Sequence, residues 1–484
     1  MTVPLAMPAP ATLWAHIALI ARIAARPMIA ASLLAGTVPC LAAAPGPRPV
    51  ATVPYVTVSG DTLYAIAARY LRDPRDWAAL SRLNRIPAPR RLAAGIGLRL
   101  PAARLRQEPE SARVIAASGP VEHACGTAPY TPLSSGMILG EGDRVRTGLN
   151  GFVTLELTDG SHMTVPQNSL VGIGRLRQTV LTGATDRVIG LQQGEVDSEV
   201  THAAKKDDRF QIRSPSVVAG VRGTRFRVRY GVAEAQTAVE VLDGAVGVDA
   251  AAAPAPAPGV PLQASAQLVT ANFGSVTRAG GGMDSGIGDP VALLPAPALA
   301  DPGRTQDGKQ VAFDLVPAGA MTGAAGGYRV QVARDADLLD LIRDRHVSAP
   351  HADFNDLPDG TYFVRISAID RNGLEGQSQA YAFERREFDL SAAAEPHAGG
   401  RDYTFRWFAG RPGLQTRFRF VLAATPDLRR PLVDQPDLET DQIVVTDLPP
   451  GVYYWSVTGE QFDNGRFYEK ASAVRSFTVA GQDP

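Results

Sequence analysis

The sequence predicts a multidomain, mainly β protein, and three observations support this prediction. The chain has 484 residues, more than a single hydrophobic core usually organises. Its central part reads as short apolar segments separated by glycine turns, which is typical of β structure. Its C-terminal part repeats at a spacing of about 91 residues, the size of one β-sandwich. We therefore expect a small βααβ module, a β-rich domain built as a roll, sandwich or solenoid, and two C-terminal β-sandwiches.

The amino-acid composition indicates a folded, soluble protein. Hydrophobic residues make up 45% of the chain and charged residues 20%, which is ordinary for a folded, soluble protein. The formal net charge of -1 gives no electrostatic argument for a nucleic acid or an anionic membrane, so we expect no nucleic-acid partner. Only two cysteines occur, and removal of the N-terminus would leave Cys125 without an intrachain disulfide partner.

The N-terminus has the pattern of an export signal. Residues 28–44 form a short apolar run that follows two arginines and ends in small residues, which predicts a signal peptide over residues 1–43. The alternatives are an uncleaved membrane anchor, although the run is short for a span of about 20 residues, and a lipid anchor on Cys40. No later stretch could cross a bilayer, so the mature chain is expected to be exported, periplasmic and without a membrane span.

The next segment has clear signals for the βααβ module. Residues 55–58 read as a strand, and the turn after it offers Asp61 or Thr62 as a helix cap. Apolar residues then recur at helical spacing, and Asp73 before a proline marks the start of a second helix. Residues 92–100 return as a strand.

This module, residues 50–101, resembles a LysM domain over essentially its whole length. The residues that carry the resemblance are Tyr55, Val56, Val58, Gly60, Asp61, Thr62, Leu63, Ile66, Ala67, Arg69, Tyr70, Trp77, Leu80, Leu83, Asn84, Ile86, Pro89, Leu92, Gly95, Leu98, Leu100 and Pro101.

The resemblance implies binding of glycans that contain N-acetylglucosamine, such as peptidoglycan or chitin. In the family the sugar lies between the loop after the first strand and the loop after the second helix, here residues 59–63 and 83–87. Asp61 and Thr62 could instead act only as helix caps, and Trp77 is expected to pack in the core. The glycan-binding residues that the resemblance implies are Ser59, Gly60, Asp61, Thr62, Leu63, Leu83, Asn84, Arg85 and Ile86.

A β-rich domain is expected over residues 106–280, with its core at 113–248. Residues 158–161 and 242–245 each contain Asp-Gly, the strongest short hairpin signal. Further motifs lie at residues 142–148, 151–157, 159–161, 194–196, 214–215 and 221–228. On these segments the domain resembles the FecR family, whose founding members relay a transporter signal to a cytoplasmic sigma factor through a membrane span. This chain has the predicted export signal and the LysM-like module where those parts would be, so only the periplasmic interaction domain is carried over.

Residues 225–230 alternate arginine with an apolar residue, and Gly223 precedes them. A period of two places the arginines on one face of a strand and the apolar residues on the other. The face is either solvated or a site for an envelope protein partner, and Gly223 indicates a bulge or a close backbone approach. The arginines assigned to partner binding are Arg222, Arg225, Arg227 and Arg229.

The C-terminal repeat predicts two sandwiches, at residues 300–386 and 387–480. Each copy has a turn that leads into an aromatic strand, and both resemble fibronectin type III or immunoglobulin-like modules. Tyr362, Tyr453 and Trp455 are expected to be core residues rather than ligand platforms.

The sequence gives no set of residues that would make an enzyme. The histidines are scattered, and the neighbours His123 and Cys125 lack a third group to orient them. We expect no catalytic residues, no metal and no cofactor, although peptidoglycan remodelling stays as a third hypothesis. The sequence favours a cell-wall-associated protein, tethered to peptidoglycan and acting as an interaction scaffold. The alternative is an envelope signalling component in which the FecR-like domain senses or relays the state of a partner.

Overall fold

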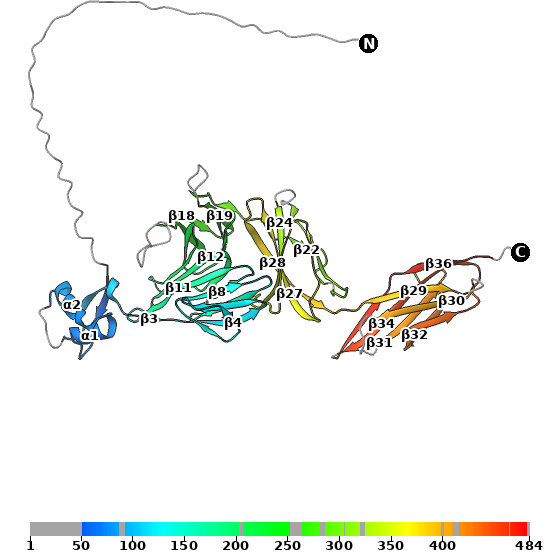
Figure 1. The fold of residues 1–484 in the computed structure, drawn as a ribbon, viewed down its shortest axis with the longest axis horizontal. Helices are drawn as coiled ribbons and strands as arrows, with labels where there is room; N and C mark the ends of the chain where they lie inside the picture. Colours follow the sequence, from blue (N-terminus) through cyan, green and yellow to red (C-terminus); the bar gives the residue numbers. More distant parts are fainter. Residues whose placement is uncertain are drawn as a thin grey trace, which may run out of the picture. The chain divides into compact units, whose positions relative to one another are not determined.

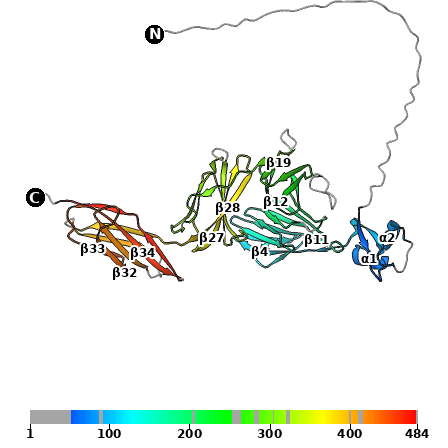
Figure 2. The same cartoon turned by 180° about the vertical axis from the view of Figure 1, so that it is seen from behind.

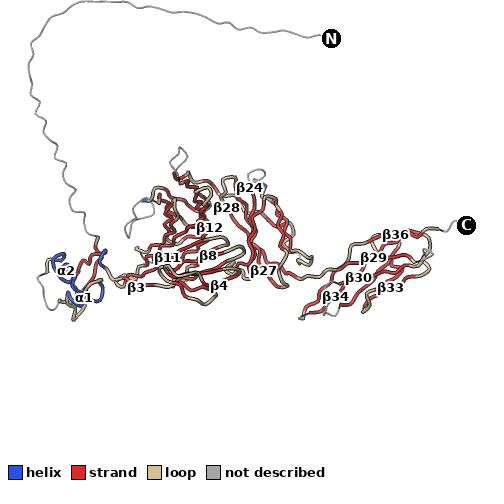
Figure 3. Tube along the Cα trace, viewed as in Figure 1, coloured by secondary structure: helices blue, strands red, loops and turns tan. Residues whose placement is uncertain are grey.

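The computed structural model describes residues 51–86, 92–202, 205, 207–251, 264–279, 286–303, 305–319, 325–397, 401–409, 416–463 and 465–481. The predicted signal peptide with Cys40 lies outside these residues, and so does most of the Ala-Pro segment at 250–258. Among the described residues, α-helix occurs only in the N-terminal module, and both α-helices have eight residues, too short to cross a bilayer (Figure 3).

The N-terminal module has the predicted βααβ order. Its two strands pair antiparallel, with Thr52 opposite Pro101 and Val56 opposite Gly97. Asp73 caps the second helical segment as predicted, but the first turn there is a 3-10 helix. A core that includes Leu63, Ile66, Leu80 and Leu98 fills the space between strands and helices. The elements are β1 (Thr52–Val56), α1 (Leu63–Tyr70), the 3-10 helix Pro74–Asp76, α2 (Trp77–Asn84) and β2 (Gly97–Pro101) (Figure 1).

The FecR-like region consists of two sheets around one apolar core. Strand β12 (Thr185–Val200) belongs to both sheets, because its first half pairs with β11 and β13 and its second half with β10 and β15. The other strands of the first sheet are β3 (Gln107–Pro109), β5 (Val121–Cys125), β6 (Thr131–Pro132), β8 (Asp143–Thr147), β11 (Leu170–Thr179), β13 (Arg209–Arg213), β14 (Val217–Val221), β17 (Ala245–Ala250) and β18 (Gln267–Thr270). Those of the second sheet are β4 (Ala112–Ser118), β7 (Ile138–Leu139), β9 (Phe152–Leu157), β10 (His162–Val165), β15 (Thr224–Gly231), β16 (Gln236–Asp243), β19 (Phe273–Arg278), β20 (Gly286–Ile287) and β21 (Val291–Ala292).

Glycines stand where the chain passes from one sheet to the other. Gly194, Gly223 and Gly244 have φ of 82°, 80° and 82°, in the left-handed region that favours glycine. A Cβ on Gly223 would lie 2.5 Å from the Cα of His202, and one on Gly244 would lie 2.8 Å from the carbonyl oxygen of Gly223. The close backbone approach predicted at Gly223 is therefore present.

The two Asp-Gly turns have different roles. Residues 158–161 connect β9 to β10, which pair with each other, so the first predicted hairpin is confirmed. The hairpin predicted at 242–245 is wrong. There β16 pairs with β15 and β19, whereas β17 pairs with β14 and β18, so the turn carries the chain between sheets.

The two C-terminal repeats are β-sandwiches with the same strand order. In the first, β22–β23–β26 face β25–β24–β27–β28, and in the second, β29–β30–β33 face β32–β31–β34–β35 with β36 beside β34 (Figures 1 and 2). The strands of the first are β22 (Ala298–Leu299), β23 (Val311–Val316), β24 (Ala325–Ala333), β25 (Leu341–Val347), β26 (His351–Phe354), β27 (Gly360–Asp370) and β28 (Glu375–Arg385). Those of the second are β29 (Leu390–Pro396), β30 (Tyr403–Ala409), β31 (Thr416–Ala423), β32 (Pro431–Leu438), β33 (Gln442–Val445), β34 (Gly451–Asp463), β35 (Arg466–Ala471) and β36 (Arg475–Val479).

Equivalent tyrosines make the same hydrogen bond in the two repeats. Tyr362 donates its hydroxyl to the carbonyl oxygen of Pro358 at 3.0 Å, and Tyr453 donates to that of Pro449 at 2.7 Å. Both rings are buried in the sandwich cores, as is Trp455. The prediction that these aromatic residues are core residues is confirmed.

Substituting Gly223 by alanine should destabilise the FecR-like region more than the same change at Gly160. Gly160 has almost the same φ of 81° but open space around it, so Gly160→Ala should cost only the backbone strain of about 1–2 kcal/mol. Gly223→Ala adds a clash with the backbone of His202. Differential scanning calorimetry of the two variants checks this, and equal unfolding temperatures would contradict the steric role of Gly223.

Candidate functional site

The first loop predicted to contact sugar is a turn held by its own carboxylate. Gly60 has φ of 89°, and Asp61 accepts hydrogen bonds from the amide of Val58 and the hydroxyl of Tyr55, both at 2.8 Å. Asp61 is only 5% exposed. Burial, followed by the hydrogen bond to Asp61, raises the pKa of Tyr55 to about 12. The Asp61 side chain therefore shapes the loop, and its neighbours Ser59 and Gly60 face solvent.

The end of this loop starts the first helix. Thr62 is the N-cap, and its hydroxyl accepts from the amide of Ala65 at 3.0 Å, which confirms one of the two predicted caps. Leu63 is 2% exposed and lies in the module core. Any contact that Leu63 makes with a glycan must therefore come from its backbone.

The second predicted loop is fastened by Asn84. Its side-chain amide donates to the carbonyl oxygens of Leu80 and Arg99, both at 2.9 Å, and its oxygen accepts from the Arg99 amide at 2.7 Å. Arg85 ends the helix in the left-handed conformation, with φ of 55°. Ser81 donates to the carbonyl oxygen of Ile86 at 2.6 Å. The remainder of the predicted loop, Pro87, lies outside the described residues.

Four of the nine predicted glycan residues face solvent, namely Ser59, Gly60, Leu83 and Arg85. Leu63 and Ile86, one from each loop, pack in or against the same core cluster, so both loops rest on one support. Trp77 also packs against this cluster, as predicted. Of the four exposed positions, only Arg85 carries a charge.

The middle of the arginine face of β15, at Arg227, is buried, whereas Arg225 and Arg229 are partly exposed. Phe226, Val228 and Tyr230 fill the core of the FecR-like region, as the alternation predicts. On the opposite face Arg227 is only 1% exposed, because the first sandwich covers it. A solvated arginine face is thus the wrong expectation for Arg227, and its side chain is not available to a separate partner protein.

Glu375, at the start of β28, is the centre of a buried charge cluster. One carboxylate oxygen lies 2.6 Å from Nη1 of Arg227, and the other lies 2.7 Å from Nη1 of Arg329 on β24. Arg227 also donates to the carbonyl oxygens of Glu375 and Gly376, at 2.7 and 2.8 Å. Ser367 donates to the same carboxylate at 2.6 Å. The two arginines hold the pKa of Glu375 well below its usual range, despite its complete burial.

Other ion pairs extend the cluster across the junction. Arg329 pairs with Glu195 of β12 at 2.7 Å and with Asp344 of its own sandwich at 2.6 Å. Arg365 pairs with Asp197 of β12 at 3.1 Å. Across the junction, β12 is thereby paired with β24 and β27, and β15 with β28, while the Arg329–Asp344 pair joins β24 to β25 within the sandwich.

Apolar contacts close one side of the same junction. Phe152 of β9 packs with Leu338 and Leu341 of the first sandwich, and Phe363 lies against them. Thr154 donates to the carbonyl oxygen of Leu339 at 2.6 Å. The junction therefore combines charge pairing with an apolar patch.

The other predicted arginines lie at the margins of this cluster. Arg229 is 31% exposed, donates to the carbonyl oxygen of Gly373 and lies 3.9 Å from Glu240. Arg225 is half-buried and stands opposite Asp243 of β16. Arg222 lies elsewhere, on the wall of a pocket near the corner glycine Gly223.

Glu240 on β16 is the least well neutralised acid of the cluster. It is 2% exposed, and the nearest guanidinium nitrogen, Nε of Arg227, is 3.7 Å away. Its carboxylate accepts from the backbone amide of Glu375 at 3.1 Å. Burial raises the pKa of Glu240 to about 7, and the nearby arginines oppose this only in part.

Comparison with known families supports the two N-terminal resemblances. Residues 55–101 match the family model described as LysM domain, and residues 143–247 match the model described as FecR protein. Neither matched family is catalytic. No curated protein matches the chain.

Three similar solved structures share little sequence with the chain. A candidate anti-sigma factor from Parabacteroides distasonis is 15% identical, with 31% of this chain and 59% of that chain covered and a TM-score of 0.23. The chain thus spans less than two thirds of that structure. The FN1–FN3 domains of chicken CNTN1 are 12% identical over 55% of this chain and 96% of that chain, with a TM-score of 0.22. The fibronectin(III)-like modules of Clostridium thermocellum CbhA are 14% identical over 37% and 90%, with a TM-score of 0.19.

Replacing Glu240 by glutamine should remove part of the pH dependence of stability. Since the pKa of Glu240 in the folded chain, about 7, exceeds its ordinary value, the folded state favours the protonated acid. Stability should therefore fall as the pH rises from 5 to 8, by about 2 kcal/mol for this group. Glu375 does not contribute to the pH dependence of stability between pH 5 and 8. Its pKa is lowered in the folded state, so stability is lost only when the pH falls below about 4.5.

Calorimetry of the wild type and Glu240→Gln between pH 5 and 8 checks this expectation. The variant should have a flatter profile and a higher unfolding temperature at pH 8. Glu199→Gln, an exposed position on β12, is the control and should follow the wild type. Parallel profiles for Glu240→Gln and the wild type would contradict the argument.

Proposed function

We propose that this chain is a non-enzymatic, wall-binding protein of the bacterial periplasm, which holds peptidoglycan through its N-terminal module. The single observation that carries the proposal is the match of residues 55–101 to the LysM domain. The proposed glycan contacts are the exposed side chains of Ser59, Leu83 and Arg85 together with the backbone of residues 60–63. The carboxylate of Asp61 and the amide of Asn84 would act indirectly, by fixing the two loops.

A single contact between one such module and glycan should be weak. Firm attachment would come from a polymer that offers many sites, or from several copies of the chain. The predicted export signal would bring the chain to the wall, and the FecR-like region and the sandwiches would then be displayed as a scaffold.

The charge cluster supports a scaffold in which two regions act as one body. Arg227, Arg329 and Arg365 each pair across the junction between the FecR-like region and the first sandwich. Breaking a buried ion pair typically costs about 3–5 kcal/mol. A partner protein would therefore meet a fixed composite surface rather than two independent domains.

A second candidate function is envelope signalling, and the match of residues 143–247 to FecR protein favours it. In this role the FecR-like region would sense or relay the state of an envelope partner. Deleting the gene should then change transcription that responds to envelope signals, and restoring the wild-type chain should reverse the change. If transcription is unaltered under both inducing and non-inducing conditions, the signalling role is rejected and the scaffold role remains.

Wall binding is tested by co-sedimentation of the full mature chain with insoluble peptidoglycan and with uncharged chitin. We expect the wild type to sediment, and the double variant Ser59→Glu, Leu83→Gln to bind about tenfold more weakly, because it alters both exposed loops. Arg75→Gln is the matched control, since it makes the same change in net charge on an exposed turn of the module. Failure of the wild type to sediment with either polymer would reject the proposal.

A further inference from the structure

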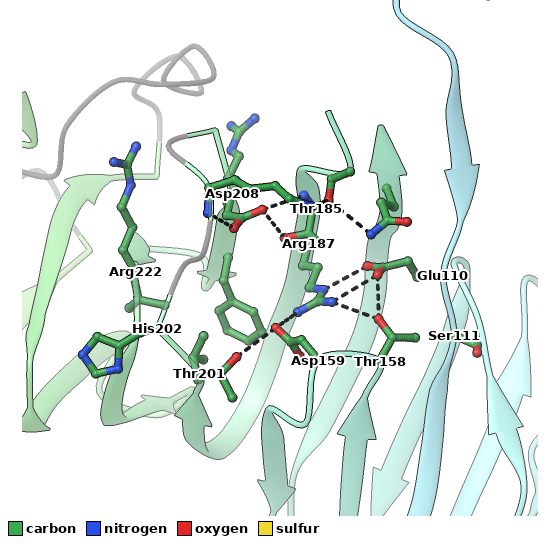
Figure 4. A pocket seen from close by; sticks show the side chains of 18 of the residues that line it. Glu110, Ser111, Thr158, Asp159, Thr185, Arg187, Thr201, His202, Asp208 and Arg222 are labelled. Atoms are coloured by element: carbon green, nitrogen blue, oxygen red, sulfur yellow. Dashed lines mark hydrogen bonds and ion pairs between the residues drawn. The ribbon is translucent and has the colours of Figure 1, made fainter. Parts of the chain in front are cut away.

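A pocket of about 860 Å³ in the FecR-like region has its central charges paired within the chain. Figure 4 shows the guanidinium of Arg187 turned toward Glu110 and Asp159, which lie 3.0 and 2.5 Å from it. Asp159 also accepts a hydrogen bond from Thr201 at 3.1 Å. These pairs join separate segments of the region and serve the fold itself. The charges on the outer face of the second sandwich are paired less completely.

That outer face repeats the one by which the first sandwich docks on the FecR-like region. In the first sandwich, the face of β25–β24–β27–β28 that points away from the core is covered by the FecR-like region. The equivalent face of the second is that of β32–β31–β34–β35 (Figure 1). Arg329 stands opposite Ser367 in the first face. Arg419 stands opposite Thr458 at the same point of the second. The side chain of Arg329 is 2% exposed, whereas that of Arg419 is 49% exposed.

The ion pair at the centre of the docking face is repeated as well. Arg329 pairs with Asp344 at 2.6 Å, and its Nη1 also donates to Glu195 of the FecR-like region. Arg419 pairs with Asp434 at 2.7 Å through Nε and Nη2. Within the described part of the chain, Nη1 of Arg419 donates to no group. The second arginine therefore lacks the carboxylate that the first receives from across a junction.

The apolar part of the docking face is also present twice. Leu338 and Leu428 lie in equivalent loops and share a left-handed backbone, with φ of 61° and 55°. In the first sandwich, Leu338 packs with Phe152 of the FecR-like region. In the second, Leu428 and Tyr454 are half-buried, and Leu432 at the start of β32 is 58% exposed. The patch that receives a phenylalanine in the first sandwich is thus open in the second.

The opposite end of the second face carries exposed phenylalanines and acids. Phe462 on β34 and Phe467 on β35 stand opposite each other and are 70% and 60% exposed. Beside them Glu460 stands opposite Glu469, an arrangement of like charges that destabilises a sheet. Neither acid makes an ion pair within the residues that the structure describes. This end therefore offers the aromatic and acidic groups that the other end lacks.

We propose that the outer face of β32–β31–β34–β35 binds the same face of a second copy of this chain. The arginine, the two acids, the open apolar patch and the phenylalanines all lie on this one surface, so the face is complementary to itself. A two-fold contact of this kind makes every interaction twice. The dimer carries two N-terminal modules, which strengthens attachment to a polymer. The proposal itself does not depend on glycan binding.

The two-fold axis passes near Thr458, close to the middle of β34. An axis there reverses both the direction and the order of the strands, so β35 of one copy lies over β31 of the other. Phe467 then lies over the open patch around Leu428, as Phe152 lies against the equivalent patch of the first sandwich. Glu469 of one copy is brought toward the open Nη1 of Arg419 in the other.

Sedimentation-velocity ultracentrifugation of the full mature chain over a concentration series tests the proposal. We expect a reversible equilibrium between monomer and dimer. Phe467→Ser should weaken the dimer by about tenfold or more, because each dimer loses two aromatic anchors. Phe408→Ser is the matched control, since Phe408 is 64% exposed on β30 in the other sheet of the same sandwich. A chain that is monomeric at every concentration overturns the proposal, and so does a dimer that Phe467→Ser weakens no more than Phe408→Ser.

The variant Glu469→Lys tests the charged contact separately. It should weaken the dimer by about tenfold or more, because the lysine then faces Arg419 of the other copy. Its unfolding temperature as a monomer should not fall, since the change removes the repulsion between Glu460 and Glu469. Glu395→Lys, an exposed position on β29 in the other sheet, is the control with the same change in charge. Wild-type dimer affinity in Glu469→Lys would overturn the proposal.

Discussion

A charged group that leaves water must find a counter-charge, and this constraint governs the centre of the molecule. The carboxylate of Glu375 is buried between Arg227 of the FecR-like region and Arg329 of its own sandwich. Without it, Arg227 would keep only the distant Glu240 at 3.7 Å, whereas Arg329 would still pair with Glu195 and Asp344. An isolated buried ion costs several kcal/mol, so Arg227 depends on Glu375 most. The pairs form only when β15 and β28 adopt one relative position. Charge pairing therefore selects the packing of the two regions, and the apolar contacts around Phe152 add stability to the position so selected.

The N-terminal module uses polar side chains in a related way. Asp61 and Asn84 match the LysM pattern, yet both make hydrogen bonds within the module, Asp61 to the amide of Val58 and the hydroxyl of Tyr55 and Asn84 to backbone groups. A loop fixed by buried polar groups presents its exposed backbone in one geometry, which lowers the entropy lost when a sugar binds. Loss of glycan binding in an Asp61 variant would thus report on loop shape. Exposed positions such as Ser59 and Leu83 report on contact itself.

Much of the fold could be predicted from local patterns. The alternation in β15 and the repeated aromatic strands gave strand faces and core residues correctly, because side-chain period is a local property. The partner of a polar face is not local. Arg227 and Arg329 alternate with core residues as solvent-facing arginines would, and only Glu375, 148 residues beyond Arg227, shows otherwise. The hairpin predicted at Asp243 was wrong for a similar reason. The Asp-Gly dipeptide predicts a tight turn, but it does not predict which strands pair on either side of that turn.

Arginines of the FecR-like region therefore differ in how completely the fold neutralises their charge. Arg227 is fully buried and donates to three oxygens of Glu375 and Gly376, so its charge is spent on holding the fold. Arg209 keeps 14% of its side chain exposed and lies 3.7 Å from Asp186, whose other carboxylate oxygen pairs with Arg175 at 2.8 Å. A guanidinium that leaves water completely needs a full set of acceptors, because the cost of losing its hydration is large. A guanidinium that keeps part of its hydration is stable beside one shared acid, so the number of acceptors around each arginine follows its burial.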